Sequence, residues 1–186
     1  MNTESDTKES ETSATTDGNE IVFRRPQLAD GKAVFDFIQE CGVLEVNTAY
    51  CYFLLCSHFA GTCVIAEQDG KMVGFLGGYI EPSDQSSYFV WQVGVAAEAR
   101  GQGLARRLID SALSRNECRD VYYVEATVAP SNKPSSALFH KLAKKYDAPV
   151  EVLPFLKKEH FGALDHEEEE LFRIGPISKQ TRTTGA

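Results

Sequence analysis

The stretch ARGQGLARRLID at residues 99–110 decides the fold, because it joins a glycine-rich turn directly to an amphipathic helix. Leu104, Leu108 and Ile109 recur at the spacing that buries one helix face. Glycines before such a helix let the backbone approach a ligand and leave the first N–H groups uncapped. With the helix dipole they form a candidate site for a pyrophosphate. Arg106, Arg107 and Asp110 are expected to face solvent, and Arg100 adds a formal positive charge to the anion site.

Strands and helices are expected on both sides of this stretch. Asp69-Gly70 between two β-rich runs is a strong hairpin-turn signal. Asp30 can cap a helix that Gly42 ends, Asn47 or Thr48 can cap the next, and a later helix can start at Asn132 and Pro134. In chain order we expect a strand at 21–26, helices at 30–42 and 49–59, a hairpin at 62–80, a strand at 86–95, the helix from 104, a strand at 120–128, a helix at 131–146 and strands at 148–155 and 169–177.

This order predicts an α+β fold, an α/β mixed sheet with helices on both faces. We expect one domain over residues 21–177. Residues 1–20 are polar and rich in Ser, Thr and Glu, which is typical of a disordered tail, and residues 178–186 are expected to be a flexible tail.

Composition excludes several classes of function. The 186-residue chain has a net charge of −8, which argues against non-specific binding to nucleic acid or to an anionic membrane and is compatible with a cationic small substrate. Apolar runs are too short to span a bilayer, and the N-terminus lacks the apolar segment of a secretory signal. The five cysteines form no C-x-x-C pair, so neither a metal site nor a disulfide framework is expected, and the cytoplasm is the expected location.

Two common phosphate loops do not match the glycine-rich turn. A P-loop needs Lys and then Ser or Thr after its last glycine, whereas Gly103 is followed by Leu104 and Ala105. The dinucleotide fingerprint needs a third Gly or Ala where Arg106 stands, and no parallel strand–helix–strand unit precedes it. A simple glycine turn that opens a helix remains an alternative.

The turn resembles the acetyl-CoA motif of the Gcn5-related N-acetyltransferase (GNAT) superfamily. Residues 100–105, RGQGLA, match its pattern Q/R-x-x-G-x-G/A, and residues 132–139, NKPSSALF, resemble the family's N-x-x-A/S-x-x-L-Y. The resemblance covers about residues 20–177. It implies a central, mostly antiparallel sheet in which two strands splay apart, with acetyl-CoA bound between them.

The GNAT resemblance also implies roles for individual residues. Val93 and Val95 would offer backbone groups to the pantetheine arm, and Asn132 would touch the pantetheine or the thioester. The pyrophosphate would be held by Arg100, Gly101, Gly103, Leu104 and Ala105. Phe139 departs from the pattern, because many members have a tyrosine there that protonates the leaving thiolate. Without that hydroxyl, another group or a water must protonate the thiolate, or the thiolate must leave without protonation.

A closer resemblance is to the L-2,4-diaminobutyrate acetyltransferases of ectoine synthesis. It is carried by GVLEVNTAYCYFLL (42–55), YFVWQVGV (88–95), VEATVAPSN (124–132) and DHEEEELFRIGPI (165–177). It implies transfer of acetyl from acetyl-CoA to the 4-amino group of L-2,4-diaminobutyrate, by direct attack of the amine in a ternary complex. A homodimer is expected as well.

Such a substrate needs acceptors for two ammonium groups and a donor for one carboxylate. Glu125 inside an apolar strand needs a partner and is the first candidate for general base, with His166 and Asp165 behind it. Asn47, Tyr50 and His166 are candidate donors to the substrate carboxylate. The expected substrate-binding residues are Glu45, Asn47, Tyr50, Trp91, Thr127 and Asp165. The run 167–170 can also be a solvated acidic face.

Two rival functions remain open at this stage. The first is a GNAT enzyme for another small amine, such as a polyamine, which would suit the acidic composition. The second is a catalytically silent domain that binds acetyl-CoA as a sensor, and the missing tyrosine at Phe139 favours it. No metal is expected in any of these readings.

Overall fold

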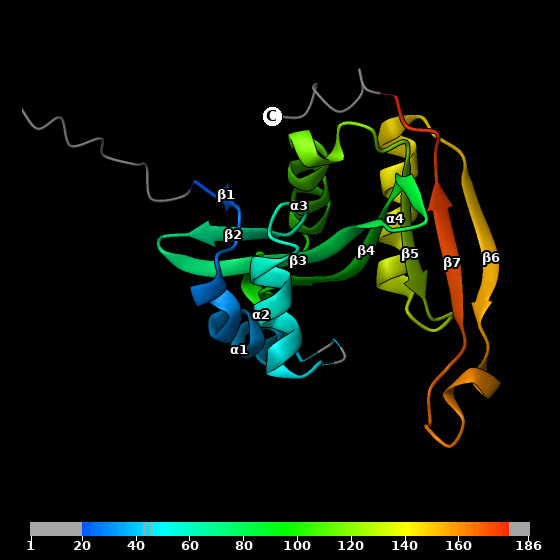
Figure 1. Ribbon diagram of the computed structural model, residues 1–186, viewed down its shortest axis with the longest axis horizontal. Helices are drawn as coiled ribbons and strands as arrows, with labels where there is room; N and C mark the ends of the chain where they lie inside the picture. Colours follow the sequence, from blue (N-terminus) through cyan, green and yellow to red (C-terminus); the bar gives the residue numbers. More distant parts are fainter. Residues whose placement is uncertain (1–19, 43, 45, 179–186) are drawn as a thin grey trace, which may run out of the picture.

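Seven strands form one mixed sheet in the computed structural model, which describes residues 20–178 apart from 43 and 45 (Figure 1). The expected tails, 1–20 and 178–186, lie outside the described residues except for residues 20 and 178, and the candidate Glu45 lies outside them as well. The strand order is β1-β2-β3-β4-β5-β7-β6, and among these pairs β4 and β5 run parallel while the others run antiparallel. The strands are β1 (Val22–Arg24), β2 (Val64–Gln68), β3 (Lys71–Glu81), β4 (Asp84–Val95), β5 (Tyr123–Val128), β6 (Val150–Leu156) and β7 (Glu169–Ile174).

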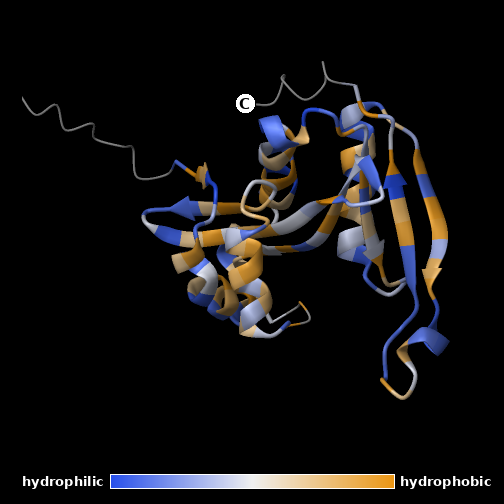
Figure 2. Cartoon of the chain, viewed as in Figure 1, coloured by the Kyte–Doolittle hydropathy of each residue, from blue (hydrophilic) through white to orange (hydrophobic). Residues whose placement is uncertain are grey.

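Helices cover both faces of the sheet, as the sequence predicts. Helices α1 (Gly31–Cys41) and α2 (Ala49–Ser57) pack on one face, and α3 (Leu104–Leu113) and α4 (Lys133–Tyr146) pack on the other (Figure 1). Each pair has its own hydrophobic core, and Figure 2 shows hydrophobic residues along α2 and on parts of α3 and α4. Short 3-10 helices occur along the chain between the strands and α-helices, at Leu28–Asp30, Ala97–Ala99, Asn116–Cys118 and Lys158–Phe161.

The local signals in the sequence mark the ends of these elements. Asp69 and Gly70 both have positive φ, 52° and 72°, in the turn between β2 and β3. Gly42 ends α1 in the left-handed conformation, and the side chain of Asn132 accepts a hydrogen bond from the Ser135 N–H at the start of α4. Asp30 does occupy the position before α1, but its carboxylate binds Arg24 and not the helix.

The charged positions of α3 are only partly as expected. Leu104, Leu108 and Ile109 are buried, so the predicted apolar face is confirmed. Asp110, however, does not face solvent: it accepts a hydrogen bond from Tyr146 Oη at 2.6 Å and pairs with Lys145 Nζ at 2.5 Å. These two contacts join α3 to α4 and fix their separation.

Strands β4 and β5 separate after three paired positions, which confirms the expected splay. Their parallel register runs from Ser87 opposite Tyr123 to Phe89 opposite Glu125, although β4 continues to Val95. A bulge in β4 accompanies the separation: Gly77 of β3 lies opposite Gln92 and Gly78 lies opposite Val90, so Trp91 has no partner in that register. Beyond this point the edge of β4 that faces β5 is not paired with it.

Candidate active site

A single cleft follows the gap between the splayed strands. Three adjoining cavities of about 550, 310 and 410 Å3 share lining residues. The first and second share Val95, Arg100, Ala105, Pro134 and Leu138, and the second and third share Leu44, Val93, Asn132 and Ser135. The cleft therefore runs from the N-terminus of α3, past the edge of β4, to the segment before β7.

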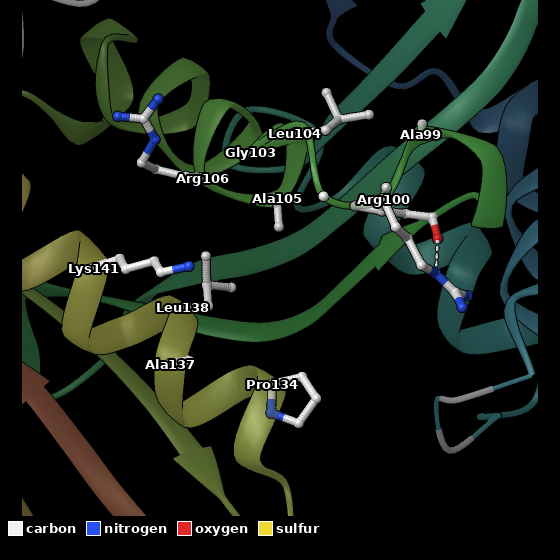
Figure 3. Close-up of a pocket in the computed structure, with 12 residues that line it drawn as sticks. Ala99, Arg100, Gly103, Leu104, Ala105, Arg106, Pro134, Ala137, Leu138 and Lys141 are labelled. Atoms are coloured by element: carbon white, nitrogen blue, oxygen red, sulfur yellow. Dashed lines mark hydrogen bonds between the residues drawn. The ribbon is translucent and has the colours of Figure 1, made fainter.

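The glycine-rich turn lines the first cavity (Figure 3). Gly101 and Gly103 have φ of 78° and 74°, which favours glycine at both positions. A Cβ at Gly101 would meet nothing within 4 Å, so the space beside the turn is open. No side chain caps the N-terminus of α3 within the described part of the chain, and its N–H groups are available to an anion.

Arg100 lines the same cavity, but its guanidinium points away from α3 and α4 (Figure 3). Its Nε donates to the carbonyl of Val95 at 3.1 Å, and Nη2 donates to the carbonyl of Cys41 at 3.0 Å. The arginine thus ties the end of β4 to the end of α1. In this structure it shapes the turn, and its predicted contact with a pyrophosphate would require it to reorient.

Helix α4 forms the opposite wall of the cleft. Asn132 and Ser135 line both the middle and the far part, and Phe139 lies one turn beyond Ser135 on the same face. Phe139 is 3% exposed and packs against Phe172, with ring centroids 6.1 Å apart. This position therefore combines core packing with contact to the cleft and carries no hydroxyl.

The far end of the cleft is acidic. Its walls include Asn47, Trp91 and Thr127, together with the carboxylate-rich segment before β7: Asp165, His166, Glu167 and Glu169. Trp91, which occupies the bulge of β4, is 44% exposed. Tyr50 is 70% exposed and is not among the residues that line these cavities. The structure thus brings together four of the residues expected to bind the substrate: Asn47, Trp91, Thr127 and Asp165. Tyr50 lies apart from them.

The geometry around His166 defines its tautomer. Its Nδ1 lies 2.6 Å from the carbonyl oxygen of Glu167, and because a carbonyl oxygen can only accept, Nδ1 carries the proton. The other nitrogen, Nε2, is then an acceptor in the neutral ring, and it lies 3.7 Å from Glu169 Oε1. The ring stacks on Phe161 with centroids 4.0 Å apart, which fixes its plane.

Glu125, the first candidate for general base, lies in an ion-pair network beside the splay. Its carboxylate, 6% exposed, pairs with Arg173 of β7 and accepts from Ser87 Oγ at 3.3 Å. Arg173 also binds Asp84 at 3.2 Å. Glu125 is not among the residues that line the three cavities. Glu125 instead belongs to an ion-pair network that joins β4, β5 and β7 where the splay begins.

Asp84 is the second carboxylate partner of Arg173 in that network. Hydrogen bonds from the Ser86 and Ser87 hydroxyls hold the pKa of Asp84 well below its usual range. Asp84 is therefore expected to be charged at neutral pH, which suits its pairing with the arginine.

Several residues of the cleft were not expected from the sequence. Arg106 and Lys141 line the first cavity from α3 and α4, and Ser135 and Glu169 line its continuation. The spacing of Pro134, Leu138 and Lys141 on one face of α4 was the available signal for Lys141. Helix packing decides which face of α4 lines the cleft, and a local sequence pattern does not predict helix packing. Among the described residues, no group of three or more His, Cys, Asp or Glu could hold a metal ion.

Comparison with known proteins identifies the family. A model described as "Acetyltransferase (GNAT) family" matches residues 32–143, which contain the turn, α3 and most of α4. The chain belongs to the GNAT family. GNAT members are acetyltransferases, and the splayed sheet with its glycine-rich turn is the architecture that the resemblance predicted.

Individual relatives narrow the assignment within GNAT. An L-2,4-diaminobutyric acid acetyltransferase from Marinococcus halophilus is 43% identical over 159 residues, which are 86% of this chain and 92% of the relative. Another, from Halomonas elongata, is 37% identical over 158 residues, 84% of this chain and 82% of the relative. Within GNAT the chain falls in the family of these enzymes, as the sequence resemblance indicated.

A solved structure agrees with this placement. Diaminobutyrate acetyltransferase EctA from Paenibacillus lautus, in complex with its substrate L-2,4-diaminobutyric acid and coenzyme A, superposes with a TM-score of 0.82 at 40% identity. The match covers 86% of this chain and 96% of that one. The GNAT fold expected from the sequence is therefore confirmed over nearly the whole described domain.

Proposed function

We propose that this chain transfers acetyl from acetyl-CoA to the 4-amino group of L-2,4-diaminobutyrate, forming N4-acetyl-L-2,4-diaminobutyrate in ectoine synthesis. The observation that carries the proposal is the continuous cleft, which joins an anion-binding helix terminus to an acidic end. A long anionic cofactor fits the first part, and a small cationic acceptor fits the second. Relatives that match most of this chain are named for that reaction.

Acetyl-CoA lies along the cleft in this proposal. The backbone N–H groups at residues 101–105 bind its pyrophosphate, and Leu104 and Ala105 supply the wall beside it. The pantetheine arm extends along β4 at Val93 and Val95, where the strand has left β5 and can pair with an added chain. Asn132 lies opposite, at the junction of the cofactor and acceptor parts.

The chemical step is attack of a neutral amine on the thioester carbonyl. An amine with an unperturbed pKa near 10.4 costs roughly 4–5 kcal/mol to deprotonate at pH 7. His166 is the proposed general base, because its Nε2 accepts in the neutral ring and Glu169 stabilises the imidazolium that forms. Asp165, on the same segment, is the second candidate.

Groups on both walls assist the rest of the reaction. A backbone N–H of the Val93–Val95 segment polarises the carbonyl oxygen as negative charge develops on it. The C–S bond then breaks, and the CoA thiolate takes a proton from a water or from the hydroxyl of Ser135. Phe139 cannot supply that proton. No cysteine stands in a Cys–His arrangement in the described cleft, which favours direct transfer.

The enzyme selects the 4-amino group because the pocket binds the 2-ammonium group and the carboxylate at the other end of the substrate. Carboxylates at the far end, Asp165 and Glu167 among them, accept from the 2-ammonium group, with Glu45 as a further proposed acceptor. Asn47 is the proposed donor to the substrate carboxylate, with Tyr50 as an alternative that would have to move. Trp91 walls the pocket and can face a cation.

An acceptor panel tests the proposal. Thiol release from acetyl-CoA is measured with L-2,4-diaminobutyrate, ornithine, lysine and spermidine as acceptors. The proposal expects kcat/KM for diaminobutyrate to exceed the others by at least about a hundredfold, because a pocket that pairs both charged groups of one substrate penalises analogues that leave them unpaired. Preference for spermidine would favour the acidic end as a polyamine site. Binding of acetyl-CoA without any transfer would favour a sensor.

We also propose a cytoplasmic homodimer. Val152, Leu153 and Phe155 of the edge strand β6 are 40–50% exposed, and a second copy would cover them. The five cysteines are free thiols in the structure, and a reducing compartment would keep them so. No helix among the described residues is long and apolar enough to cross a membrane. The net charge of −8 supports the absence of nucleic-acid and membrane partners.

A further inference from the structure

Two cations line the first cavity without a partner of their own. Arg106 of α3 and Lys141 of α4 make no hydrogen bond or ion pair within the part of the chain that the structure describes. Three other cations have partners: Arg100 binds backbone carbonyls, Lys145 pairs with Asp110, and Arg173 pairs with Glu125 and Asp84. In a chain of net charge −8, unpaired cations on two walls of one cavity indicate an anionic ligand.

Arg106 and Lys141 lie away from the part of the cleft proposed for the pantetheine arm. Lys141 follows Pro134 by seven residues on the same face of α4, which is about 10 Å along the helix axis. Figure 3 shows its side chain reaching into the gap between α3 and α4. The guanidinium of Arg106 folds back along α3, with one nitrogen 3.9 Å from the position that a Cβ on Gly103 would take.

The turn already provides one phosphate site through its backbone N–H groups. Coenzyme A carries a pyrophosphate and, separately, a 3′-phosphate on its ribose. We infer that Arg106 and Lys141 bind this 3′-phosphate and make the enzyme select coenzyme A over its 3′-dephospho form. The inference rests on the proposed function only in taking acetyl-CoA as the donor, and it assigns these two residues to cofactor specificity.

Calorimetric titration with coenzyme A and 3′-dephospho-coenzyme A tests the inference directly. Both ligands keep the pyrophosphate and differ only in the 3′-phosphate. For the unaltered chain we expect coenzyme A to bind about tenfold tighter or more, since each charge-assisted contact to phosphate adds to affinity. The preference should decrease between about 0.05 and 0.5 M salt, because the pair is solvent-accessible.

Substitutions assign that preference to the two side chains. The double variant Arg106→Gln, Lys141→Gln should bind both ligands within about twofold of each other, and each single variant should lose part of the preference. Matched controls are Arg107→Gln, whose side chain lies over the Phe23 ring, and Lys144→Gln, which is exposed on α4. Neither lines the cavity, and both should keep the full preference.

The alternative results contradict the inference. If the double variant weakens both ligands equally, the cations serve the pyrophosphate and not the 3′-phosphate. If it leaves the preference unchanged, they bind neither. Because no acceptor amine is present, these outcomes are independent of which amine the enzyme acetylates. Failure of the acceptor proposal would leave this titration interpretable, provided that coenzyme A binds.

Discussion

His166 is the residue on which the proposed chemistry most depends. Replacing it by glutamine keeps a polar side chain but removes the acceptor nitrogen that faces Glu169. We expect His166→Gln to lower kcat about a hundredfold, because a positioned base contributes roughly that factor.

The matched control is His140→Gln on the exposed side of α4, where the ring is 5.6 Å from Phe172 and outside the cleft. It should keep kcat. A His166 variant with an unchanged kcat would exclude His166 as the base.

Glu125 is expected to act on stability and not on proton transfer. Glu125→Gln leaves Arg173 with Asp84 as its remaining carboxylate partner in the described network. Loss of one member of a buried, hydrogen-bonded pair should lower the free energy of unfolding by about 1–3 kcal/mol. Urea denaturation measures this change, and kcat should decrease by less than about threefold, with the pH profile unchanged. A large decrease in kcat without loss of stability would restore Glu125 as a candidate base.

At the scale of elements, the turn before α3 depends on two glycines in the left-handed region. An alanine at Gly103, where φ is 74°, costs about 1–2 kcal/mol and shifts the N–H groups that face the cofactor. We expect Gly103→Ala to raise the KM for acetyl-CoA about tenfold or more. Steady-state kinetics with varied acetyl-CoA measures the change.

Gly70→Ala is the control for backbone strain alone. Gly70 has a nearly equal φ of 72° in the β2–β3 turn, and a Cβ there would meet nothing within 4 Å. It should lower stability by a similar amount and leave the KM unchanged. Equal effects of both substitutions on the KM would show that strain, and not the anion site, governs cofactor affinity.

The elements with strong local signals could be predicted from the sequence. The Asp69-Gly70 turn, the Gly42 helix end and the apolar face of α3 each follow from a few neighbouring residues, and the structure confirms them. The partner of Glu125 could not be predicted in this way, because Arg173 is 48 residues away and meets it only through the pairing of β5 with β7. Asp110 was misplaced for the same reason, since its partners lie on α4.

The cofactor half of the cleft was easier to predict than the acceptor half. One contiguous motif, residues 100–105, builds the turn, and Gly101, Gly103, Leu104 and Ala105 all line the first cavity. The acceptor end is assembled from α4, the bulge of β4 and the segments before α2 and β7. Charged side chains at such a junction obtain their neighbours from tertiary packing, which single-sequence patterns do not encode.

For the whole molecule, acid should remove part of the stability. Hydrogen bonds and charge from Arg24 lower the pKa of Asp30 below its usual 3.8, with Asp30 Oδ2 2.7 Å from Nη1. A carboxyl group whose folded pKa is lowered stabilises the fold above its unfolded pKa, and this contribution is lost as pH falls through the folded pKa. We therefore expect Asp30→Asn to be less stable than the unaltered chain at pH 7, with a difference that shrinks below about pH 4.

Urea denaturation at several pH values checks this prediction. The control is Asp36→Asn, which removes an exposed pair with Lys32 on α1 and should change stability by less than about 0.5 kcal/mol. A difference for Asp30→Asn that stays constant down to pH 3 would contradict the linkage to this carboxyl group.

We propose that the cleft presents the 4-amino group of L-2,4-diaminobutyrate to the thioester while the acidic segment before β7 holds the other end of the substrate. The most direct measurement is the NMR spectrum of the product formed from diaminobutyrate and acetyl-CoA labelled with 13C at the acetyl carbonyl. We expect a single product in which the labelled carbonyl is bonded to N4. Acetylation at N2, or a mixture of N2 and N4 products, would contradict it.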